Sequence, residues 1–337
     1  MTLIYALLIF CLLIFFHELG HFTLAKLCGV KVNEFALGMG PAVLKKQKGE
    51  TLYSLRAFPI GGFCAMEGED EDSEDERAFN KKAAWQKALI VVAGAAMNLL
   101  VAIVIMSAIS FYVGTSTTTI DTVQDGLPAQ AAGIESGDTI IAINGITVSE
   151  WRDVYTFISE SDGETIRITL TDADGSERTV ATETVADADG RRIIGITPTT
   201  ERHLISSVKT GVQNTWALGA SMLDVLKGLF TGGVSASELS GPVGIVAVVN
   251  DTASRGFIYI AYLTALISLN LAIMNMLPFP ALDGGRFVFI IIRAVTGKAI
   301  TDEIEGKVHF AGILVLLALM LYVTWNDIVK FILPIFN

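Results

Sequence analysis

The stretch Leu12-Leu13-Ile14-Phe15-Phe16-His17-Glu18-Leu19-Gly20-His21 decides how this chain folds. Apolar residues run directly into the two histidines, and the apolar segment as a whole extends from Leu3 to about Val30. A helix rises 1.5 Å per residue, so about 20 residues cross the ~30 Å hydrocarbon core of a membrane. Ionisable side chains at that depth are costly, and they are normally present for function. The stretch therefore predicts a membrane-spanning helix with a functional polar cluster inside it.

The spacing of the polar residues in this stretch indicates a metal site. His17 and His21 are four residues apart, so a helix places both imidazoles on one face. Two neutral imidazoles can bind Zn²⁺ and leave positions for a third ligand and a water molecule. Glu18 is then placed to take a proton from that water. A buried polar cluster with a purely structural role is the alternative interpretation.

The composition of the chain agrees with a membrane protein. Of the 337 residues, 52% are hydrophobic and 18% are charged, and the mean hydropathy is +0.55. Soluble proteins carry about 25% charged residues, so a wholly soluble chain and a disordered chain are both excluded. The net charge of −11 argues against a nucleic-acid partner, because phosphate backbones bind to a basic face. Three cysteines cannot all pair, which excludes a disulfide scaffold.

Three more apolar segments follow the first, at Ala88–Val113, Phe257–Leu282 and Val308–Trp325. The first two of these are each 26 residues long without a charge, and a polar insert separates them. We therefore predict a polytopic α-helical membrane protein with about four transmembrane helices. Its expected parts are the first two transmembrane helices with the loop between them (1–113), a small folded domain (114–202), a surface helix with a connecting segment (203–256) and the last two transmembrane helices (257–337).

The density of lysine and arginine predicts the orientation of the chain. The loop 28–87 carries nine of these residues in 60 positions, whereas the insert 114–256 carries nine in 143. Basic residues close to the membrane favour the cytoplasmic side. We therefore expect the loop and the neighbouring polar cluster on the cytoplasmic side, and the insert and both termini outside.

The insert contains the run Ala132-Gly133-Ile134-x-x-Gly137-Asp138-x-Ile140-x-x-Ile143-Asn144-Gly145. Pro128 suits the first position of a short helix, Gly133 suits its end, and Asn144-Gly145 suits a tight turn between strands. Alternation over 165–170 predicts another strand. The run resembles that of bacterial PDZ domains, which bind extended peptides by strand addition. The resemblance implies one extracytoplasmic α+β PDZ-like domain.

The peptide-binding edge of this domain is expected at Ile193-Ile194-Gly195-Ile196. Ile194, Gly195 and Ile196 would then contact the ligand. An ordinary core strand is the alternative interpretation.

After the domain, apolar residues recur at helical spacing from Leu204 to Phe230. They predict a helix that lies on the outer membrane surface. A helix packed on the insert is the alternative.

A zinc site needs a third protein ligand, and Asp283 is the best candidate. It lies in Asn275-Met276-Leu277-Pro278-Phe279-Pro280-Ala281-Leu282-Asp283-Gly284, on the side of the membrane expected for the two histidines. The two prolines break the helix, and membranes tolerate irregular backbone only where protein or a cavity covers it. His203 and His309 are more simply interpreted as surface or interfacial histidines. Asp283 as a plain helix cap is the alternative.

Together these motifs resemble those of the site-2 proteases, the intramembrane zinc metalloproteases, in the bacterial branch that includes the regulator of sigma-E protease. The matching features are H-E-L-G-H at 17–21, N-x-x-P-x-x-x-L-D-G at 275–284, the PDZ-like insert and Ser240-Gly241-Pro242-Val243-Gly244-Ile245. The Asp of L-D-G is the third zinc ligand in that family, which implies the same role for Asp283. There are three departures. Gly94-Ala95-Ala96-Met97-Asn98 lacks the proline of G-P-x-x-N, and Gly38-Met39-Gly40 replaces G-F-G. One PDZ-like domain is present, where some members of the family carry two.

The resemblance also implies a membrane-associated β-hairpin on the cytoplasmic side. It is expected around Pro59–Phe63 and Met66–Glu69, with strands near 51–58 and 62–67. Its exposed edge would pair with an unwound substrate. The residues of that edge are Gly62, Phe63, Cys64, Ala65 and Met66. Asn275 would donate a hydrogen bond to the substrate backbone.

The activity that the resemblance implies is zinc-dependent hydrolysis of peptide bonds in or near the transmembrane segments of single-span membrane proteins. The substrates would include an anti-sigma factor or a signal-peptide remnant, in the bacterial cell (inner) membrane. The PDZ-like domain would bind a peptide, and the lipid bilayer is the other partner.

Two alternatives stand beside this function. One is a non-catalytic membrane adaptor that presents a PDZ domain outside. The other is a soluble-type zinc protease on a membrane anchor, which would carry H-E-x-x-H outside an apolar helix, whereas here the motif lies inside one.

Overall fold

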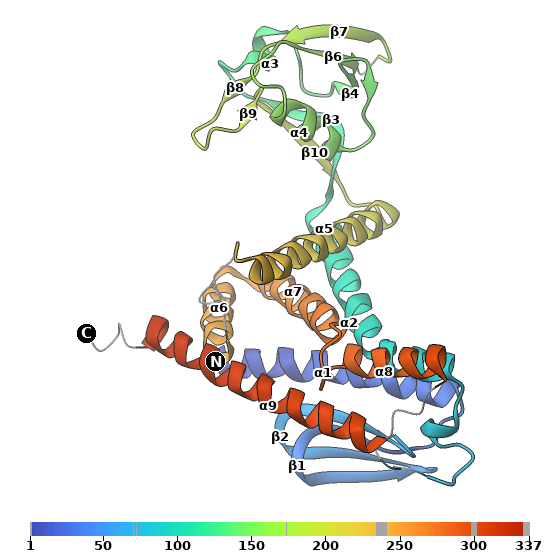
Figure 1. Cartoon of the computed structure of the whole chain (residues 1–337). Helices are drawn as coiled ribbons and strands as arrows, with labels where there is room; N and C mark the ends of the chain where they lie inside the picture. The colour runs from blue at the N-terminus through green and yellow to red at the C-terminus, as the bar shows by residue number, and fades with distance from the viewer. Residues whose placement is uncertain are drawn as a thin grey trace. The chain divides into compact units, whose positions relative to one another are not determined.

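The computed structural model describes residues 2–69, 71, 73–172, 174–233, 241–297 and 302–332 (Figure 1). The chain forms two compact units. The membrane unit comprises Met1–Ile109 and Gly211–Asn337, and the insert unit comprises Ser110–Thr210. The insert unit is thus one continuous segment between the two halves of the membrane unit.

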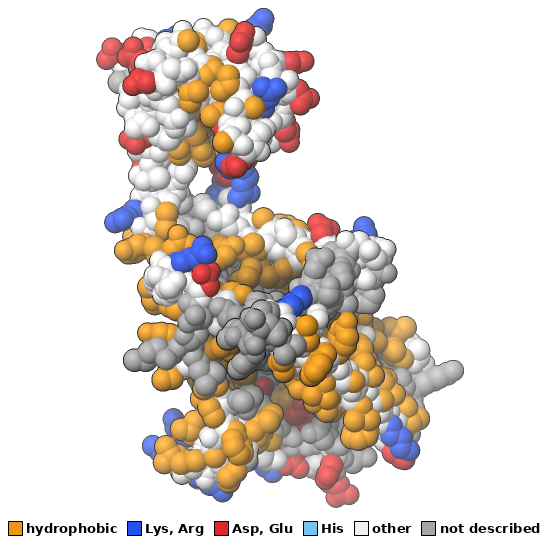
Figure 2. All heavy atoms as spheres, turned by 90° about the vertical axis from the view of Figure 1, so that its left-hand side faces the viewer, with side chains coloured by type: hydrophobic (Ala, Val, Ile, Leu, Met, Phe, Trp, Pro, Cys, Tyr) orange, Lys and Arg blue, Asp and Glu red, His pale blue; other side chains and the backbone are white. Residues whose placement is uncertain are grey.

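Within the described residues, four helices are long and apolar enough to cross a membrane. They are α1 (Thr2–Leu27), α2 (Ala84–Val113), α7 (Phe257–Asn275) and α9 (Asp302–Asp327). The expected number of spans is therefore confirmed. Figure 2 shows hydrophobic side chains over much of one face of the membrane unit, and the side chains of α9 are largely exposed. Contiguous apolar surface of this kind is rare on proteins that face water, and it fits contact with a bilayer.

The remaining helices outside the insert are shorter or amphipathic. They are α5 (Leu204–Thr231), α6 (Pro242–Arg255), α8 (Asp283–Thr296) and the short segments η1 (Phe79–Lys81) and η3 (Ile328–Ile332). Of the expected Ser240–Ile245 motif, Ser240 lies outside the described residues. The third span is shorter than the apolar segment predicts, because α7 ends at Asn275 ahead of two prolines that cannot continue a helix.

Between α1 and α2 the chain forms an antiparallel sheet of two long strands, β1 (Val32–Lys48) and β2 (Thr51–Met66). Both strands bend, so the sheet has four rows in the order 62–66, 34–37, 52–55 and 44–47. Glycines with positive φ allow the bends, Gly38 and Gly40 in β1 and Gly61 in β2.

This sheet corrects the expected hairpin. The segments near 51–58 and 62–67 do not pair with each other, since both pair with the row 34–37 between them. The sequence pattern does not predict the strand over 32–48. Its first residues are held inside the sheet because Val32, Phe35 and Ala36 are buried in the core.

The sheet packs against α1, α2 and α8 through one cluster of buried side chains. Its members are Ala25, Val30, Val32, Phe35, Cys64, Met66, Phe79, Ile90, Val91 and Ile290. At the turn between β1 and β2, the Glu50 carboxylate accepts hydrogen bonds of 2.7 Å from both Nη atoms of Arg77 and of 2.6 Å from Nζ of Lys26. The hydrogen bonds from Arg77 and Lys26 lower the pKa of Glu50 to about 2. The carboxylate is therefore charged at neutral and mildly acidic pH, and it ties this turn to the end of α1.

The insert unit is built on a sheet with the strand order β10-β3-β4-β6-β7, and β5 pairs with β4. Its elements are β3 (Thr115–Val123), α3 (Pro128–Ala131), β4 (Thr139–Ile143), β5 (Ile146–Thr147), α4 (Trp151–Ser159), β6 (Ile166–Thr171), β7 (Glu177–Thr182), β8 (Val185–Ala186), β9 (Arg192–Ile193) and β10 (Ile196–Glu201). The expected strand at 165–170 is β6, and Pro128 begins α3 as expected. Asn144 and Gly145 both have positive φ, as a type I′ turn requires.

The expected edge strand Ile193–Ile196 is wrong as a single element. Ile193 ends β9, Ile194 is buried in the core, and Ile196 begins β10. The carbonyls of Ile194 and Gly195 accept hydrogen bonds from backbone amides inside the unit, so they are occupied. The strands at the two ends of the sheet order are β10 and β7, and only Ile196 of the three predicted contact residues belongs to either of them.

The long helix α5 contacts α2 through a small residue. A Cβ on Gly211 would overlap the Ser107 hydroxyl, so glycine allows the two helices to approach closely. Trp216 is 80% exposed. The helix therefore leaves large apolar side chains uncovered, which fits the predicted surface helix, and its position on a membrane stays a prediction.

Candidate metal centre

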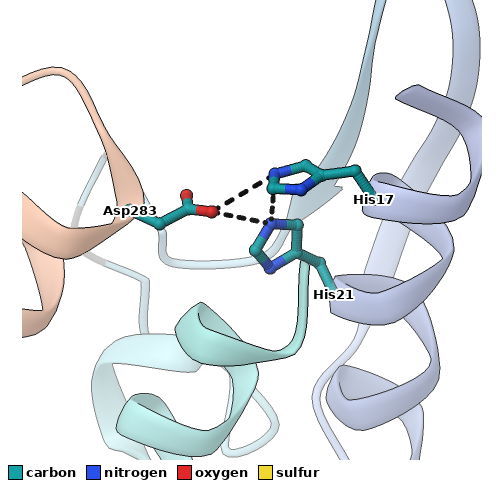
Figure 3. Close-up of side chains that lie close together, drawn as sticks. All are labelled: His17, His21 and Asp283. Atoms are coloured by element: carbon teal, nitrogen blue, oxygen red, sulfur yellow. Dashed lines mark hydrogen bonds and ion pairs between the residues drawn. The ribbon is translucent and has the colours of Figure 1, made fainter. Parts of the chain in front are cut away.

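Three side chains from distant parts of the chain converge, as the sequence predicts (Figure 3). His17 and His21 project from α1, and Asp283 is the first residue of α8. Asp283 Oδ2 lies 3.2 Å from His17 Nε2 and 3.4 Å from His21 Nε2, and the two Nε2 atoms are 3.2 Å apart. Three donor atoms therefore face one point.

The loop before α8 places the carboxylate. Helix α7 has ended, and the chain turns back sharply enough that a Cβ on Gly284 would overlap the carbonyl oxygen of Leu277. A Cβ on Gly285 would lie 2.9 Å from the carbonyl carbon of Phe279. The two glycines after Asp283 thus allow α8 to begin directly against its own loop.

The ring of His21 is oriented by the backbone of α2. Its Nδ1 lies 2.8 Å from the carbonyl oxygen of Ile90, in a buried position. A carbonyl can only accept, so Nδ1 carries the proton and donates it. The lone pair of His21 is then on Nε2, the atom that faces Asp283.

His17 has a side-chain partner on α2. Nδ1 of His17 lies 3.3 Å from Nδ2 of Asn98, a completely buried residue whose Oδ1 has no hydrogen-bond partner in the described part of the chain. When the amide oxygen of Asn98 faces His17, it accepts the Nδ1 proton and leaves the Nε2 lone pair for a metal. Ser268 of α7 donates a 2.7 Å hydrogen bond to the backbone carbonyl of Asn98, which fixes this residue from the other side.

The donor set and the space around it fit zinc. Tetrahedral zinc lies ~2.0–2.2 Å from nitrogen and oxygen ligands, which separates the ligand atoms by about 3.3–3.6 Å. Asp283 Oδ2 is buried without a hydrogen-bond partner in the described part of the chain, so a cation would satisfy it. A Cβ on Gly94 would overlap His21 Nε2 and lie 2.8 Å from His17 Nε2. Glycine at 94 therefore keeps the place of the ion clear.

A pocket of about 330 Å³ opens over these ligands. Glu18 lines it beside His17, His21 and Asp283, and the row 62–66 of β2 forms one wall. The row is close to the glutamate, because a Cβ on Gly62 would lie 3.2 Å from Glu18 Cγ. The pocket thus combines a ligand group, a carboxylate beside it and a strand edge.

Cys64 in this wall is a neutral neighbour of the site. Burial raises the pKa of its thiol, and the carboxylates of Glu69 and Glu18 raise it further. Only the thiolate binds metals well. The thiol therefore does not compete with the nitrogen and oxygen donors.

The other predicted residues lie outside the ligand group. Asn275 is the last residue of α7 and is half-buried, and His203 is exposed before α5. His309 on α9 accepts a 2.9 Å hydrogen bond at Nδ1 from the amide of Ala281, whose φ is +78°. It is thus a support of the loop that presents Asp283, which the sequence pattern does not reveal. In the sequence, Gly94 and Asn98 stand out only as the two ends of a G-P-x-x-N motif that lacks its proline.

Two imidazoles and a carboxylate form a ligand set for zinc, and a glutamate beside them completes the arrangement found in zinc metalloproteases. The chain belongs to peptidase family M50, whose model matches residues 5–319. A protein of Clostridium acetobutylicum, named provisionally as a zinc metalloprotease, is 38% identical over 97% of each chain. The zinc metalloprotease RasP of Geobacillus kaustophilus is 31% identical over 98% of this chain and 99% of its own length. Zinc is the cofactor of this family, and the apolar helices make the protein a multi-pass membrane metalloprotease.

Two solved PDZ domains match about a quarter of this chain. The PDZ domain of an SdrC-like protein from Listeria innocua covers 26% of this chain and 99% of that domain, at 22% identity and a TM-score of 0.23. That of an SdrC-like protein from Listeria monocytogenes covers 26% and 87%, at 23% identity and a TM-score of 0.22. Scores this low support no conclusion about function.

Proposed function

We propose that this protein is an intramembrane protease that hydrolyses peptide bonds in or near the transmembrane segments of single-span membrane proteins. One observation carries the proposal: two of the three convergent donors lie on α1, a helix long and apolar enough to span a membrane. A soluble-type zinc protease on a membrane anchor would carry these donors outside an apolar helix. The function of a non-catalytic adaptor does not require three convergent donors beside a glutamate.

In this proposal His17, His21 and Asp283 hold the metal, and Glu18 is the general base. Bound zinc supplies Lewis acidity, which polarises the scissile carbonyl and lowers the pKa of water towards about 7. Glu18 takes the proton from that water and passes it to the leaving nitrogen, since it lines the same pocket. Ile90 and Asn98 keep both imidazoles aimed at one point throughout.

The substrate is held as an added strand. In a membrane helix the peptide bond is protected by its own hydrogen bonds, so the substrate must unwind before it is cut. The row 62–66 pairs with 34–37 on one side, and its residues Phe63, Cys64, Ala65 and Met66 line the pocket. An unwound segment that pairs with this row gains backbone hydrogen bonds beside Glu18. Asn275, at the end of α7, donates to the substrate backbone, as the family resemblance implies.

The orientation follows from the basic residues of the loop 28–87. The metal site and the sheet face the cytoplasmic side of the bacterial cell membrane, and the PDZ-like insert lies outside. An anti-sigma factor or a signal-peptide remnant is the substrate class. The insert binds a peptide on its outer strand β10, beginning at Ile196.

The test is the variant Glu18→Gln, purified with zinc and given a tagged single-span anti-sigma factor in liposomes. Zinc content should equal that of the wild type, and cleavage should be lost, because an amide cannot take the proton. Glu303→Gln is the matched control, since Glu303 is exposed and forms an ion pair with Lys307 on the same helix. Cleavage by Glu18→Gln at the wild-type rate would refute the proposed mechanism, and zinc-independent function would favour the adaptor.

A further inference from the structure

The Glu69 carboxylate joins two parts of the chain that lie 217 positions apart in sequence. Its Oε2 accepts a 3.4 Å hydrogen bond from the backbone amide of Met66, the last residue of β2. Its Oε1 forms an ion pair with the guanidinium of Arg286. Arg286 lies on α8, one turn after Asp283. One carboxylate therefore connects the end of the row 62–66 to the helix that carries the third donor.

This ion pair lies in the wall of the pocket over the donor group. Both Glu69 and Arg286 line that pocket together with Glu18 and Asp283. They also line a second, polar pocket of about 140 Å³ on their other side. Their side chains are only 16% and 30% exposed, so water screens the pair weakly.

We propose that Glu69 is a positioning residue, which holds the row 62–66 at a fixed distance and register from Asp283 and so determines which substrate bond reaches the site. This inference rests on the proposed function of the row as the substrate-binding edge. The contact lies at the end of the row, where β2 stops and a loop begins. Misplacement of a bound substrate by about 1 Å can cost about a hundredfold in rate.

The role differs from that of Glu18. A general base changes the proton transfer, and its loss lowers kcat at any substrate concentration. A positioning residue changes which bond of the substrate lies at the site and what fraction of the substrate binds in the correct register. Loss of Glu69 should therefore raise KM and spread the cleavage over neighbouring bonds, with the pH dependence of kcat unchanged.

The experiment compares Glu69→Ala, Glu69→Gln and Glu71→Ala with the wild type, on a single-span anti-sigma factor in liposomes. Product masses give the cleaved bond, and metal analysis gives the zinc content. Glu69→Ala should raise KM about tenfold and yield products cut at adjacent bonds, with full zinc. Glu69→Gln keeps an oxygen for the Met66 amide and should recover part of the effect. Glu71→Ala, an exposed neighbour in the same loop, should resemble the wild type.

A double-mutant cycle with Arg286→Ala checks that the two charges act together. The double variant should be little worse than the worse single variant, because both break one connection. Wild-type KM and a single product in Glu69→Ala would overturn the inference, and so would loss of zinc, which would make the residue a support of the metal. Failure of the proposed function is distinguished by Glu18→Gln, which would then still cut the substrate.

Discussion

The two edges of the sheet between α1 and α2 are built in opposite ways. The outer row of β1 carries Lys45, Lys46 and Lys48, all exposed. The outer row of β2 is Gly62-Phe63-Cys64-Ala65-Met66, without a charge. Lysines on an edge strand oppose the addition of another strand. The protein thus protects one edge against strand addition and leaves the other edge open.

The open edge is also placed differently. Cys64 and Met66 are only 7% and 8% exposed, and the row forms a wall of the pocket over His17, Glu18 and Asp283. An unprotected edge in free solution would be a site of aggregation. Here only a segment that reaches the pocket can pair with it. This difference supports the proposal that substrate adds as a strand only at the row 62–66, beside the candidate metal site.

The largest effect is expected from loss of the proposed third metal ligand, Asp283, which lines the same pocket as the open row 62–66. Asp283→Ala should lower bound zinc and abolish cleavage together, because two imidazoles alone hold zinc weakly. Asp283→Asn should keep the fold and bind zinc more weakly than the wild type, since a neutral amide is a poorer ligand. Metal analysis and a cleavage assay on the same purified protein check this. Full zinc with normal activity in Asp283→Ala would show that the third ligand lies elsewhere.

The next variant makes the open edge resemble the protected one. Ala65→Lys should reduce cleavage of a single-span substrate about a hundredfold with zinc retained, because the charge opposes strand addition beside the pocket. Gln47→Lys on the protected row is the matched control and should cleave normally. The measurement is kcat/KM for both variants. Equal activity of the two would remove the distinction between the edges.

A third variant weakens the donor group without touching a ligand. Asn98→Ala removes the partner of His17 Nδ1, and such changes typically cost about 10–100-fold in metal affinity or activity. Zinc retention during titration with a chelator measures the affinity. Met97→Ala, the neighbouring position, is the control. Unchanged zinc affinity in Asn98→Ala would mean that the contact does not orient the ring.

The smallest effect concerns the turn between β1 and β2 at the protected edge. Hydrogen bonds from Arg77 and Lys26 lower the pKa of Glu50 to about 2, below its unfolded value of about 4.3. The stabilisation is therefore complete above pH 4.3 and is lost as the pH falls towards 2. Limited proteolysis of this turn should not change between pH 7 and 5. In limited proteolysis at pH 7, the Glu50→Gln variant should be cut at this turn faster than the wild type. Its own activity on a single-span substrate should stay close to that of the wild type. A marked loss of activity in this variant would show that the protected edge matters for catalysis.

The sequence predicts the parts of this site that depend on local spacing. The H-E-x-x-H motif fixes its own geometry once it lies on a helix, and long apolar segments identify the spans. Asp283 was found from broken helix and family resemblance. The pairing of rows 62–66 and 52–55 with 34–37 was not predicted, because it depends on bends at glycines and on burial of Val32 and Phe35.

Contacts between helices were equally out of reach. Gly94 and Asn98 contact the two histidines because α2 crosses α1 at the candidate metal site. No periodicity in either segment encodes that crossing. The run Ile193–Ile196 shows a different limit. A short apolar run fits a core strand and an edge strand alike, and here Ile194 belongs to the core.

Photo-crosslinking can test whether substrate adds only to the open row 62–66 of the sheet. A photoreactive phenylalanine analogue is placed at Phe63 on the open row or at Lys46 on the protected row, in the Glu18→Gln background so that bound substrate is not consumed. We expect a single-span anti-sigma factor in liposomes to crosslink strongly from position 63 and only at background level from position 46. Crosslinking from position 46 that equals or exceeds that from position 63 would contradict this expectation.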